Sequence, residues 1–517
     1  MNLFIKHAVT PLALAITLTL TGCTLTPEYE KPMVNMADAY LHTQSQQQIN
    51  NEYWWYQFND QALNSLVQDA QASNVTLKLA SNRIRMANSY QRVVESFKVP
   101  TVNIGAGYFN YQLSENSSLL GPALKPLGET IPTGGATDSL TLLDNQHDGV
   151  FVGATASWEL DLFGRIDRQT NAAKIRVEQA EIYRNGLNTI ITADLVHNYL
   201  QLRGAQQRKV LALQNIEDQR KTLELVKKVV KSGYGSELDS AQAEAMLAAT
   251  ESLIPQLEIA EQAHKHRIAI LIGEPLSQVN TRLAQDSELP NLQAIIPVGL
   301  PSDLLKRRPD IHIAEREMAA INEELGASIV NRYPKFFLTG TPGVSASSFD
   351  DLFSSDSFGW AASAGVSWNV FDGGRGKARV DMNEARFESA ALSYQHTVDS
   401  AIAEVDSALF AYGRSQQSQK RIEQALTATN RAVDKAKSLY KAGLIDHLSV
   451  LDAQRQQRMM QDRSVVAKLQ TAQVTVSLYK SLGGDWNLEQ EQDETVEPKL
   501  EEVLLKEPLA EQKLASL

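Results

Sequence analysis

The feature that most constrains this chain is an internal repeat, in which two segments share one pattern. A shift of 210 residues keeps matching residues in register without a gap over more than a hundred positions. The matched pairs include Trp158 with Trp368, Gly164 with Gly374, Gly233 with Gly443, and Gly273 with Gly483. Upstream, the offset becomes 234, at which Pro100 matches Pro334. A repeat of this kind predicts two copies of one supersecondary unit that pack on each other.

Each copy has the same order of expected elements. In the first copy, residues 59–273, we expect a helix over 60–97, strands over 101–113 and 150–160, a long helix over 165–231 and a returning helix over 236–272. In the second copy, residues 302–484, we expect a helix over 302–331, strands over 336–346 and 358–370, a long helix over 375–441 and a returning helix over 446–482. A linker over 274–301 joins the copies, and an acidic tail occupies 485–517.

The two long helices are expected because neither contains a proline. At 1.5 Å per residue, each forms a rod of about 100 Å, and such a rod needs a packing partner along its length. In the first rod, apolar residues recur every three or four positions, at Leu187, Ile191, Leu195, Tyr199 and Leu202. This narrow apolar seam predicts coiled-coil packing. In the returning helix that follows, Pro255 is expected to cause a kink.

The expected strands alternate between large apolar residues and small or polar ones. In the last strand, Trp360, Val366 and Trp368 face one way, while Gly359, Ser363 and Gly365 face the other. This alternation is what a membrane β-barrel requires, with apolar side chains towards lipid. The tryptophans at the strand ends, Trp158, Trp360 and Trp368, are expected to form an aromatic girdle. A soluble sheet with one buried face is the alternative.

Four strands are too few to close a barrel, and lipid does not tolerate open sheet edges. The strands must therefore be pooled between chains. Two chains give eight strands, whose lumen side chains would fill. Three chains give twelve, the smallest total that leaves a conduit, so we expect a homotrimer. Four chains remain an alternative.

The first 22 residues are expected to be a signal peptide. Lys6 and His7 give a basic start, and the apolar run over 8–20 is too short to span a bilayer. The following Leu20-Thr21-Gly22-Cys23 resembles the bacterial lipobox, in which the cysteine becomes the first residue and carries lipid. Residues 23–58 would then be a lipidated arm, and the resemblance to bacterial lipoproteins implies sorting to the outer membrane, because Thr24 is not Asp. A secreted protein with a chance cysteine is the alternative.

Composition excludes several classes of function. The formal net charge of −12 makes the chain a poor candidate for binding nucleic acid. Cys23 is the only cysteine, so no internal disulfide is possible. The sequence contains no evident Ser/His/Asp set, metal cluster or phosphate-binding loop. We therefore expect no enzyme activity, no cofactor and no metal site.

Taken together, these features resemble the TolC/OprM-type outer-membrane factor family, in its lipoprotein branch. The resemblance rests on motifs in order along the chain: the lipobox at Cys23, Trp54-Trp55 with Phe58, Asp60 and Leu63, then residues 307–311, 371–375 and 443–454. It implies a twelve-stranded barrel formed by three chains and continued by a twelve-helix periplasmic tunnel. It also implies docking to a periplasmic adaptor and an inner-membrane pump, with the channel itself passive.

The resemblance implies contact with the adaptor at the two helix turns, the periplasmic tips. The expected contact residues are Gly233, Ser236, Leu238, Gly443, Leu444 and Asp446. Glycine permits the backbone reversal, and Ser236 and Asp446 can cap the returning helices. These structural roles alone would also explain the residues.

The resemblance also implies a periplasmic gate at the start of the last helix. Leu448 and Asp452 match it, and a spacing of four places both on one helix face. Three copies would form a leucine ring that excludes water and a carboxylate ring that selects by charge. Ser449 stands where some relatives carry a second acidic residue, so weaker cation binding is expected. An exposed aspartate on a solvated coil is the alternative.

The sequence thus predicts an outer-membrane channel for tripartite efflux of drugs or other toxic compounds. A duct for type I protein secretion is an alternative, because it uses the same fold. A structural lipoprotein that braces the envelope is a weaker alternative, since it does not explain the strands. The sequence does not name the exported compound, because in this architecture the pump selects it.

Overall fold

The computed structural model describes residues 28–34, 36–42, 53–114, 146–290 and 299–484. The chain divides into two compact units. The first takes residues 1–32, 84–179 and 315–392, and the second takes residues 33–83, 180–314 and 393–517. The two copies of the repeat contribute to both units, so the repeat boundaries are not the boundaries of the units.

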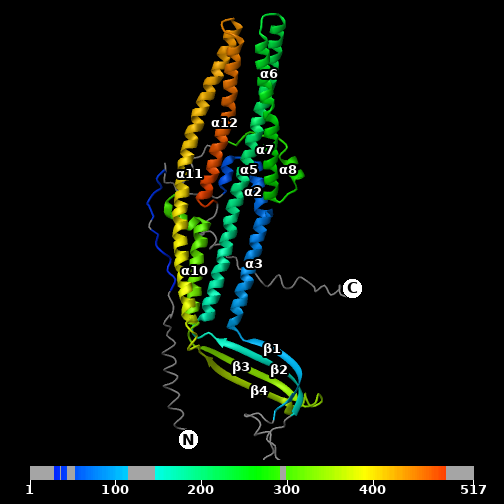
Figure 1. The fold of residues 1–517 in the computed structure, drawn as a ribbon, viewed down its shortest axis with the longest axis vertical. Helices are drawn as coiled ribbons and strands as arrows, with labels where there is room; N and C mark the ends of the chain where they lie inside the picture. The colour runs from blue at the N-terminus through cyan, green and yellow to red at the C-terminus, as the bar shows by residue number, and fades with distance from the viewer. Residues whose placement is uncertain (1–27, 35, 43–52, 115–145, 291–298, 485–517) are drawn as a thin grey trace, which may run out of the picture. The chain divides into compact units, whose positions relative to one another are not determined.

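The first unit contains one antiparallel sheet of four strands in the order β1-β2-β3-β4 (Figure 1). The strands are β1 (Thr101–Gln112), β2 (Gln146–Leu160), β3 (Lys335–Ala346) and β4 (Phe358–Ser367). Each copy supplies one pair, and the pairing of β2 with β3 joins the copies. There Gly153 lies opposite Gly343, and a Cβ on Gly343 would come within 3.0 Å of the Gly153 Cα. Small residues therefore permit the close approach of the two copies.

Some expected strand bounds were wrong. β2 begins at Gln146 instead of 150, because its additional residues pair in register with the far end of β1, where Gln112 faces Gln146. β4 ends at Ser367 instead of 370, because its pairing with β3 stops where Lys335 faces Ser367. Trp368 therefore lies just beyond the strand.

The helices of the two copies begin and end at related positions. In the first copy they are α2 (Gln61–Ser73), α3 (Val75–Glu95), α5 (Arg165–Lys231), α6 (Glu237–Glu251) and α7 (Leu253–Ile272). In the second copy they are α9 (Leu304–Arg307), α10 (Pro309–Val330), α11 (Arg375–Lys441) and α12 (His447–Ser481). The expected linker contains a further helix, α8 (Leu276–Arg282). None of the helices in the described ranges combines the length and apolar character needed to cross a membrane.

We expected one helix at the start of each copy, but the structure has two in each place, so this prediction was wrong. In the first copy, Asn74 separates α2 from α3: its side chain accepts from Thr76 N at 2.8 Å and donates to Leu271 O at 2.7 Å. In the second copy, Arg308 separates α9 from α10, which starts at Pro309. The proline ring disfavours helical geometry at the residue before it, which is Arg308.

The expected returning helix over 236–272 is also divided. α6 ends at Glu251, four residues before Pro255, and α7 begins at Leu253. A proline ring clashes with the carbonyl four residues earlier and offers no N–H to it. The interruption is the single residue Ser252, whose φ of −64° and ψ of −18° remain helical, as expected for a kinked rather than a broken helix.

In the first unit, ion pairs link α10 to α5 and α11. Arg176 of α5 contacts Glu317 at 3.0 Å and Glu324 at 2.8 Å, and Arg386 of α11 reaches Glu324 at 2.9 Å. A small apolar cluster around Met318, Ile321 and Ala390 lies among the same helices.

The second unit holds the main core, formed where the short helices pack on the long ones. Trp54 and Trp55 of the 3-10 helix η1 (Trp54–Phe58) are buried, and Trp54 stacks on Tyr479 with ring centroids 5.0 Å apart. The Tyr199 hydroxyl donates to Asp60 at 2.6 Å, and Asp60 also caps α2. The paired tryptophans thus anchor the chain preceding α2 to α12.

Candidate functional site

The expected site begins at the two helix turns, one between α5 and α6 and the other between α11 and α12 (Figure 1). Each turn contains a glycine with positive φ, +80° at Gly233 and +71° at Gly443. Backbone hydrogen bonds close them in the same way: Tyr234 N donates to Val229 O at 3.1 Å, and Leu444 N donates to Leu439 O at 3.0 Å. These bonds define the same glycine-based helix end in both copies.

Side chains then start the two returning helices. The Ser236 hydroxyl accepts from Leu238 N at 3.1 Å, and Asp239 accepts from Ser236 N at 3.2 Å, which forms a capping box. Asp446 accepts from Ser449 N at 2.9 Å. The predicted caps at Ser236 and Asp446 are confirmed.

Both turns present apolar side chains to solvent. Tyr234 is 90% exposed, Leu444 70% and Leu238 62%. The turns also border one cavity of about 260 Å³, to which Tyr234, Gly235 and Asp239 contribute from the first copy and Tyr440 and Asp446 from the second. Of the predicted adaptor-contact residues, only Asp446 lines this cavity; the grouping of the others stays a prediction.

The two predicted gate residues also lie together. Leu448 and Asp452 line a cavity of about 670 Å³, with Gln242 and Met246 of α6 opposite them. Leu448 is 49% exposed, so its side chain is not part of the core. The cavity is thus bounded by the start of α12 and by the corresponding helix of the first copy.

The Asp452 carboxylate has partners on its own helix, which the sequence reasoning missed. It accepts from Arg455 Nη2 at 2.6 Å and from Gln456 Nε2 at 2.9 Å. The spacing of three between Asp452 and Arg455 is the signal that could have predicted this pair. If three chains place Asp452 and Arg455 around one axis, the ring would carry both negative and positive charges rather than carboxylates alone.

The tryptophans of the sheet unit show the same symmetry. The Trp158 indole donates to Lys98 O at 3.0 Å, and the Trp368 indole donates to Arg332 O at 3.0 Å. Trp360 is 72% exposed and lies opposite Pro342 in β3. A tryptophan with a bonded N–H and an exposed ring suits a membrane interface, although the girdle itself stays a prediction.

Cys23 lies outside the described residues, so its predicted lipidation stays a prediction. Within the described ranges, no group of three or more His, Cys, Asp or Glu side chains could hold a metal ion.

A four-stranded sheet formed by two copies of a strand pair, together with two pairs of long helices, is the fold class of outer-membrane channels, in which a membrane β-barrel continues into a helical tunnel. The chain belongs to the outer membrane efflux protein family, whose model matches residues 66–274 and 300–484. It is thus a channel protein of the Gram-negative outer membrane. The predicted family and fold class are confirmed.

Individual relatives cover nearly the whole chain. The outer membrane protein OprJ of Pseudomonas aeruginosa is 28% identical over 480 residues, which cover 92% of this chain and 95% of OprJ. The solvent efflux pump outer membrane protein SrpC of Pseudomonas putida is 28% identical over 501 residues, 92% of this chain and 97% of SrpC. The structure of the outer-membrane channel OprN is similar with a TM-score of 0.77 and 32% identity, over 89% of this chain and 99% of OprN.

Proposed function

We propose that this protein is the outer-membrane channel of a tripartite efflux system and passively conducts drugs or other toxic compounds to the outside. The observation that carries the proposal is the matched pair of helix turns, which present exposed apolar side chains next to a cavity at the start of α12. We expect such a docking surface in a passive duct, because its partners must supply the energy and select the cargo. No catalytic step is required of this chain.

The sheet supports a trimer. Within the described residues, β1 and β4 each pair with a neighbour on one side only. Exposed apolar side chains, among them Ile104 of β1 and Trp360 of β4, lie on these edge strands. A sheet in lipid must close, because unpaired backbone groups there cost several kcal/mol each. Three chains would give a closed barrel of twelve strands.

The same geometry supports the proposed partners. The exposed Tyr234, Leu238 and Leu444 form an apolar surface suited to a periplasmic adaptor, which in turn would contact an inner-membrane pump. Cys23 would carry the lipid that holds the N-terminal arm at the outer membrane. The name of the relative SrpC, a solvent efflux pump protein, supports small toxic compounds as cargo.

Planar-bilayer recording tests the channel directly. The purified protein should insert and give discrete conductance steps, and mass measurement of the solubilised protein under native conditions should give three chains. Protein that associates with the membrane without conducting would instead support a structural lipoprotein. A functional monomer or dimer would contradict the trimer.

A pair of matched variants tests the docking surface. Leu444→Ser removes an apolar side chain that is 70% exposed at a turn, and Ile259→Ser removes one that is 71% exposed on α7. We expect only Leu444→Ser to weaken binding of the adaptor encoded beside this gene, measured by surface plasmon resonance. Equal effects, or none at Leu444, would place the adaptor elsewhere.

A further inference from the structure

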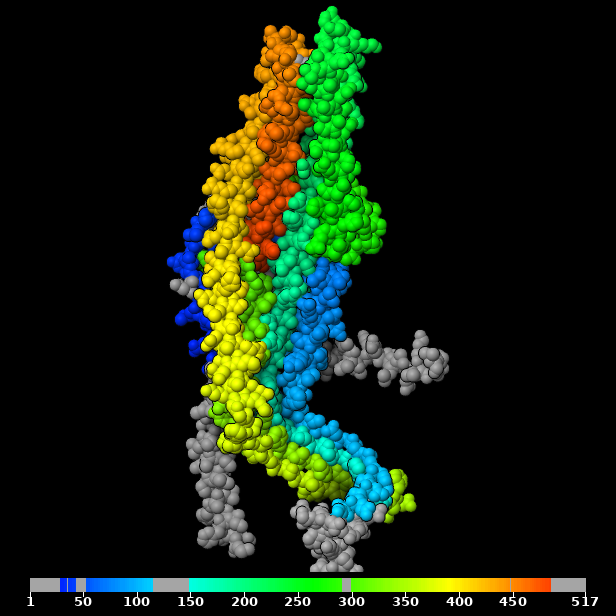
Figure 2. Space-filling view, viewed as in Figure 1, coloured from blue at the N-terminus to red at the C-terminus, as the bar shows by residue number. Residues whose placement is uncertain are grey.

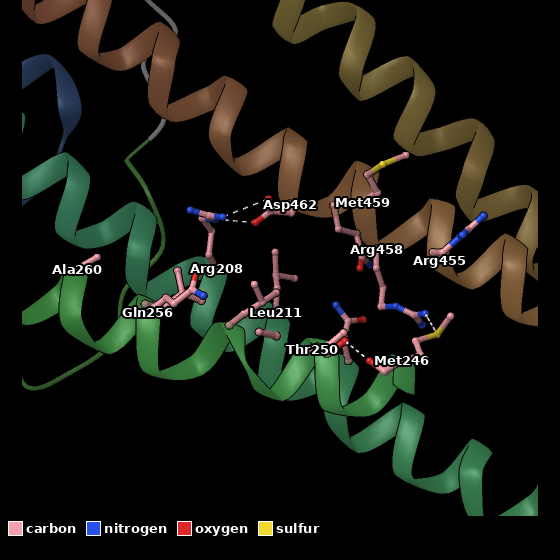
Figure 3. Close-up of a pocket in the computed structure, with 16 residues that line it drawn as sticks. Arg208, Leu211, Met246, Thr250, Gln256, Ala260, Arg455, Arg458, Met459 and Asp462 are labelled. Atoms are coloured by element: carbon pink, nitrogen blue, oxygen red, sulfur yellow. Dashed lines mark hydrogen bonds and ion pairs between the residues drawn. The ribbon is translucent and has the colours of Figure 1, made fainter. Parts of the chain in front are cut away.

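A further cavity, of about 640 Å³, lies in the second unit between α12 and the helices α5, α6 and α7, and shares Met246 and Arg455 with the cavity at the start of α12 (Figure 3). Its apolar wall is formed by leucine and methionine side chains, namely Leu211, Leu253, Leu257, Met246 and Met459. The volume falls within the range of about 300–1,000 Å³ that is typical of small-molecule sites. The surface of this helical region is visible in Figure 2.

Three arginines line this cavity, and two of them have carboxylate partners. Arg208 of α5 contacts Asp462 of α12 at 2.6 and 3.3 Å, which links the two copies (Figure 3). Arg455 contacts Asp452 at 2.6 Å. These two positive charges are therefore already neutralised.

Arg458 is different. Among the described residues, the one hydrogen-bond acceptor that its guanidinium reaches is the thioether sulfur of Met246, which Figure 3 shows across the cavity on α6. A thioether is a weak acceptor and carries no charge. Burial lowers the pKa of Arg458, which the carboxylate of Asp218 only partly offsets. An arginine still keeps its charge at neutral pH, so the cavity holds one positive charge without an ion-pair partner.

A second polar group in the cavity also lacks a partner. The side-chain carbonyl oxygen of Gln461, one turn from Arg458 on α12, is buried and has no hydrogen-bond donor among the described residues. A buried polar atom without a partner costs about 1–3 kcal/mol. An anionic ligand in the cavity would neutralise Arg458, whereas the Gln461 oxygen is closed off from solvent and adds no contact.

We infer that this cavity binds an amphiphilic organic anion, with a carboxylate or sulfonate on Arg458 and an apolar body against the leucines and methionines. Guanidinium groups bind such anions through charge-assisted hydrogen bonds. A soft metal ion is disfavoured, because Met246 already accepts from the Arg458 guanidinium, whose unpaired positive charge repels a cation. The claim that this anion is exported cargo rests on the proposed efflux function. The claim that the cavity binds an anion does not depend on that function.

Binding can be measured on the purified full-length protein in a neutral maltoside detergent, by isothermal titration calorimetry. The probe is naphthalene-2-sulfonate, and naphthalen-2-ylmethylammonium is the cation of matching shape. We expect saturable binding of one sulfonate per chain and no saturable binding of the ammonium compound. Because the assay needs no conduction, its failure would leave the channel proposal intact.

Three variants locate the site. Arg458→Met removes the charge but keeps an apolar side chain next to Met246, and should raise the Kd for the sulfonate about tenfold. Arg458→Lys should keep most of the affinity, because the positive charge remains. The control, Arg421→Gln, removes an equally charged side chain exposed on α11 and should leave the Kd unchanged.

Several outcomes would overturn the inference. Parent protein that binds no sulfonate would mean that the cavity is filled in the assembly, for example by a carboxylate of a second copy. Equal binding by the parent and Arg458→Met would place the anion elsewhere. Saturable binding of the ammonium compound in this cavity would contradict its charge preference.

Discussion

The replacement Glu261→Gln tests how α7 is held on α5. The Glu261 side chain is 11% exposed and accepts hydrogen bonds from two ammonium groups, Lys209 Nζ at 2.6 Å and Lys265 Nζ at 2.7 Å. Gln206 of α5 donates to the same carboxylate at 3.3 Å. A glutamine keeps the shape of the side chain but leaves two largely buried lysines short of a negative charge.

Two arguments give the magnitude. Removal of one partner from a buried ion pair costs about 3–5 kcal/mol. Independently, burial alone would raise the pKa of Glu261, but the bonds from Lys209 and Lys265 outweigh it and lower the pKa from 4.5 to about 2. That fall corresponds to about 3 kcal/mol. Since Asp286 lies 3.7 Å from Lys209 and supplies part of the missing charge, we expect the lower end, about 3 kcal/mol.

The sign of the pH dependence follows from the lowered pKa. Stabilisation by Glu261 is fully present above about pH 4.5, where the carboxylate is ionised in both the folded and the unfolded chain. It is lost as the pH falls from there to about 2, because the unfolded chain takes up the proton first. Glu261→Gln should lack this part of the acid dependence.

Guanidinium denaturation, followed by the helical circular dichroism signal in detergent, measures both effects. The control is Glu251→Gln on α6, since Glu251 pairs with Arg220 at 2.7 Å in an exposed position and should contribute less than about 1 kcal/mol. If Glu261→Gln and Glu251→Gln unfold at the same denaturant concentration, the ion cluster around Glu261 does not hold α7 on α5.

Three further predictions concern other parts of the chain. Cys23→Ser should abolish lipidation, measured by mass spectrometry of the N-terminal peptide, and lipid on the variant would contradict the predicted site. Some trimer should still insert, because the barrel itself holds the protein in the membrane. Asn74→Ala should lower the free energy of unfolding by about 1–3 kcal/mol, because the α3 cap and the donor to Leu271 O are both lost; an unchanged denaturation midpoint would refute that role. Asp446→Ala should weaken adaptor binding by loosening the start of α12 and leave single-channel conductance unchanged; a changed conductance would assign Asp446 to the gate instead.

The long helices and their turns could be predicted because their signals are local. Residues 165–231 and 375–441 lack proline, and Gly233 and Gly443 stand where each chain reversal needs a positive φ. The internal repeat strengthened both predictions, since each feature occurs twice. The helix caps at Ser236 and Asp446 could be predicted for the same reason, because serine and aspartate are common residues just before a helix.

The breaks in the shorter helices were harder to predict. Asn74 ends α2 by forming a cap for α3 and a bond to Leu271, which is distant in sequence. Pro255 predicted where the helix is disturbed, but not that the interruption would be confined to Ser252, which keeps helical backbone angles. At Asn74, packing on another segment decides the outcome.

Contacts between helices lay beyond the sequence reasoning. The pair of Arg208 with Asp462 joins positions 254 residues apart, and the rotation of each helix about its axis decides whether they meet. The same holds for Arg458, which is one of several arginines in α12 by sequence alone. Only the arrangement of α6 and α12 reveals that its neighbour is Met246 rather than a carboxylate.

The central claim is that this chain forms a passive channel gated at the start of α12, and single-channel conductance in planar bilayers tests it most directly. Leu448 is half exposed, and Asp452 is bonded only to residues of its own helix among those described, so neither replacement should disturb the fold. We predict that Leu448→Ala and Asp452→Ala each raise the conductance above that of the parent, and that the double variant raises it further. Variant channels that conduct like the parent would contradict the gate.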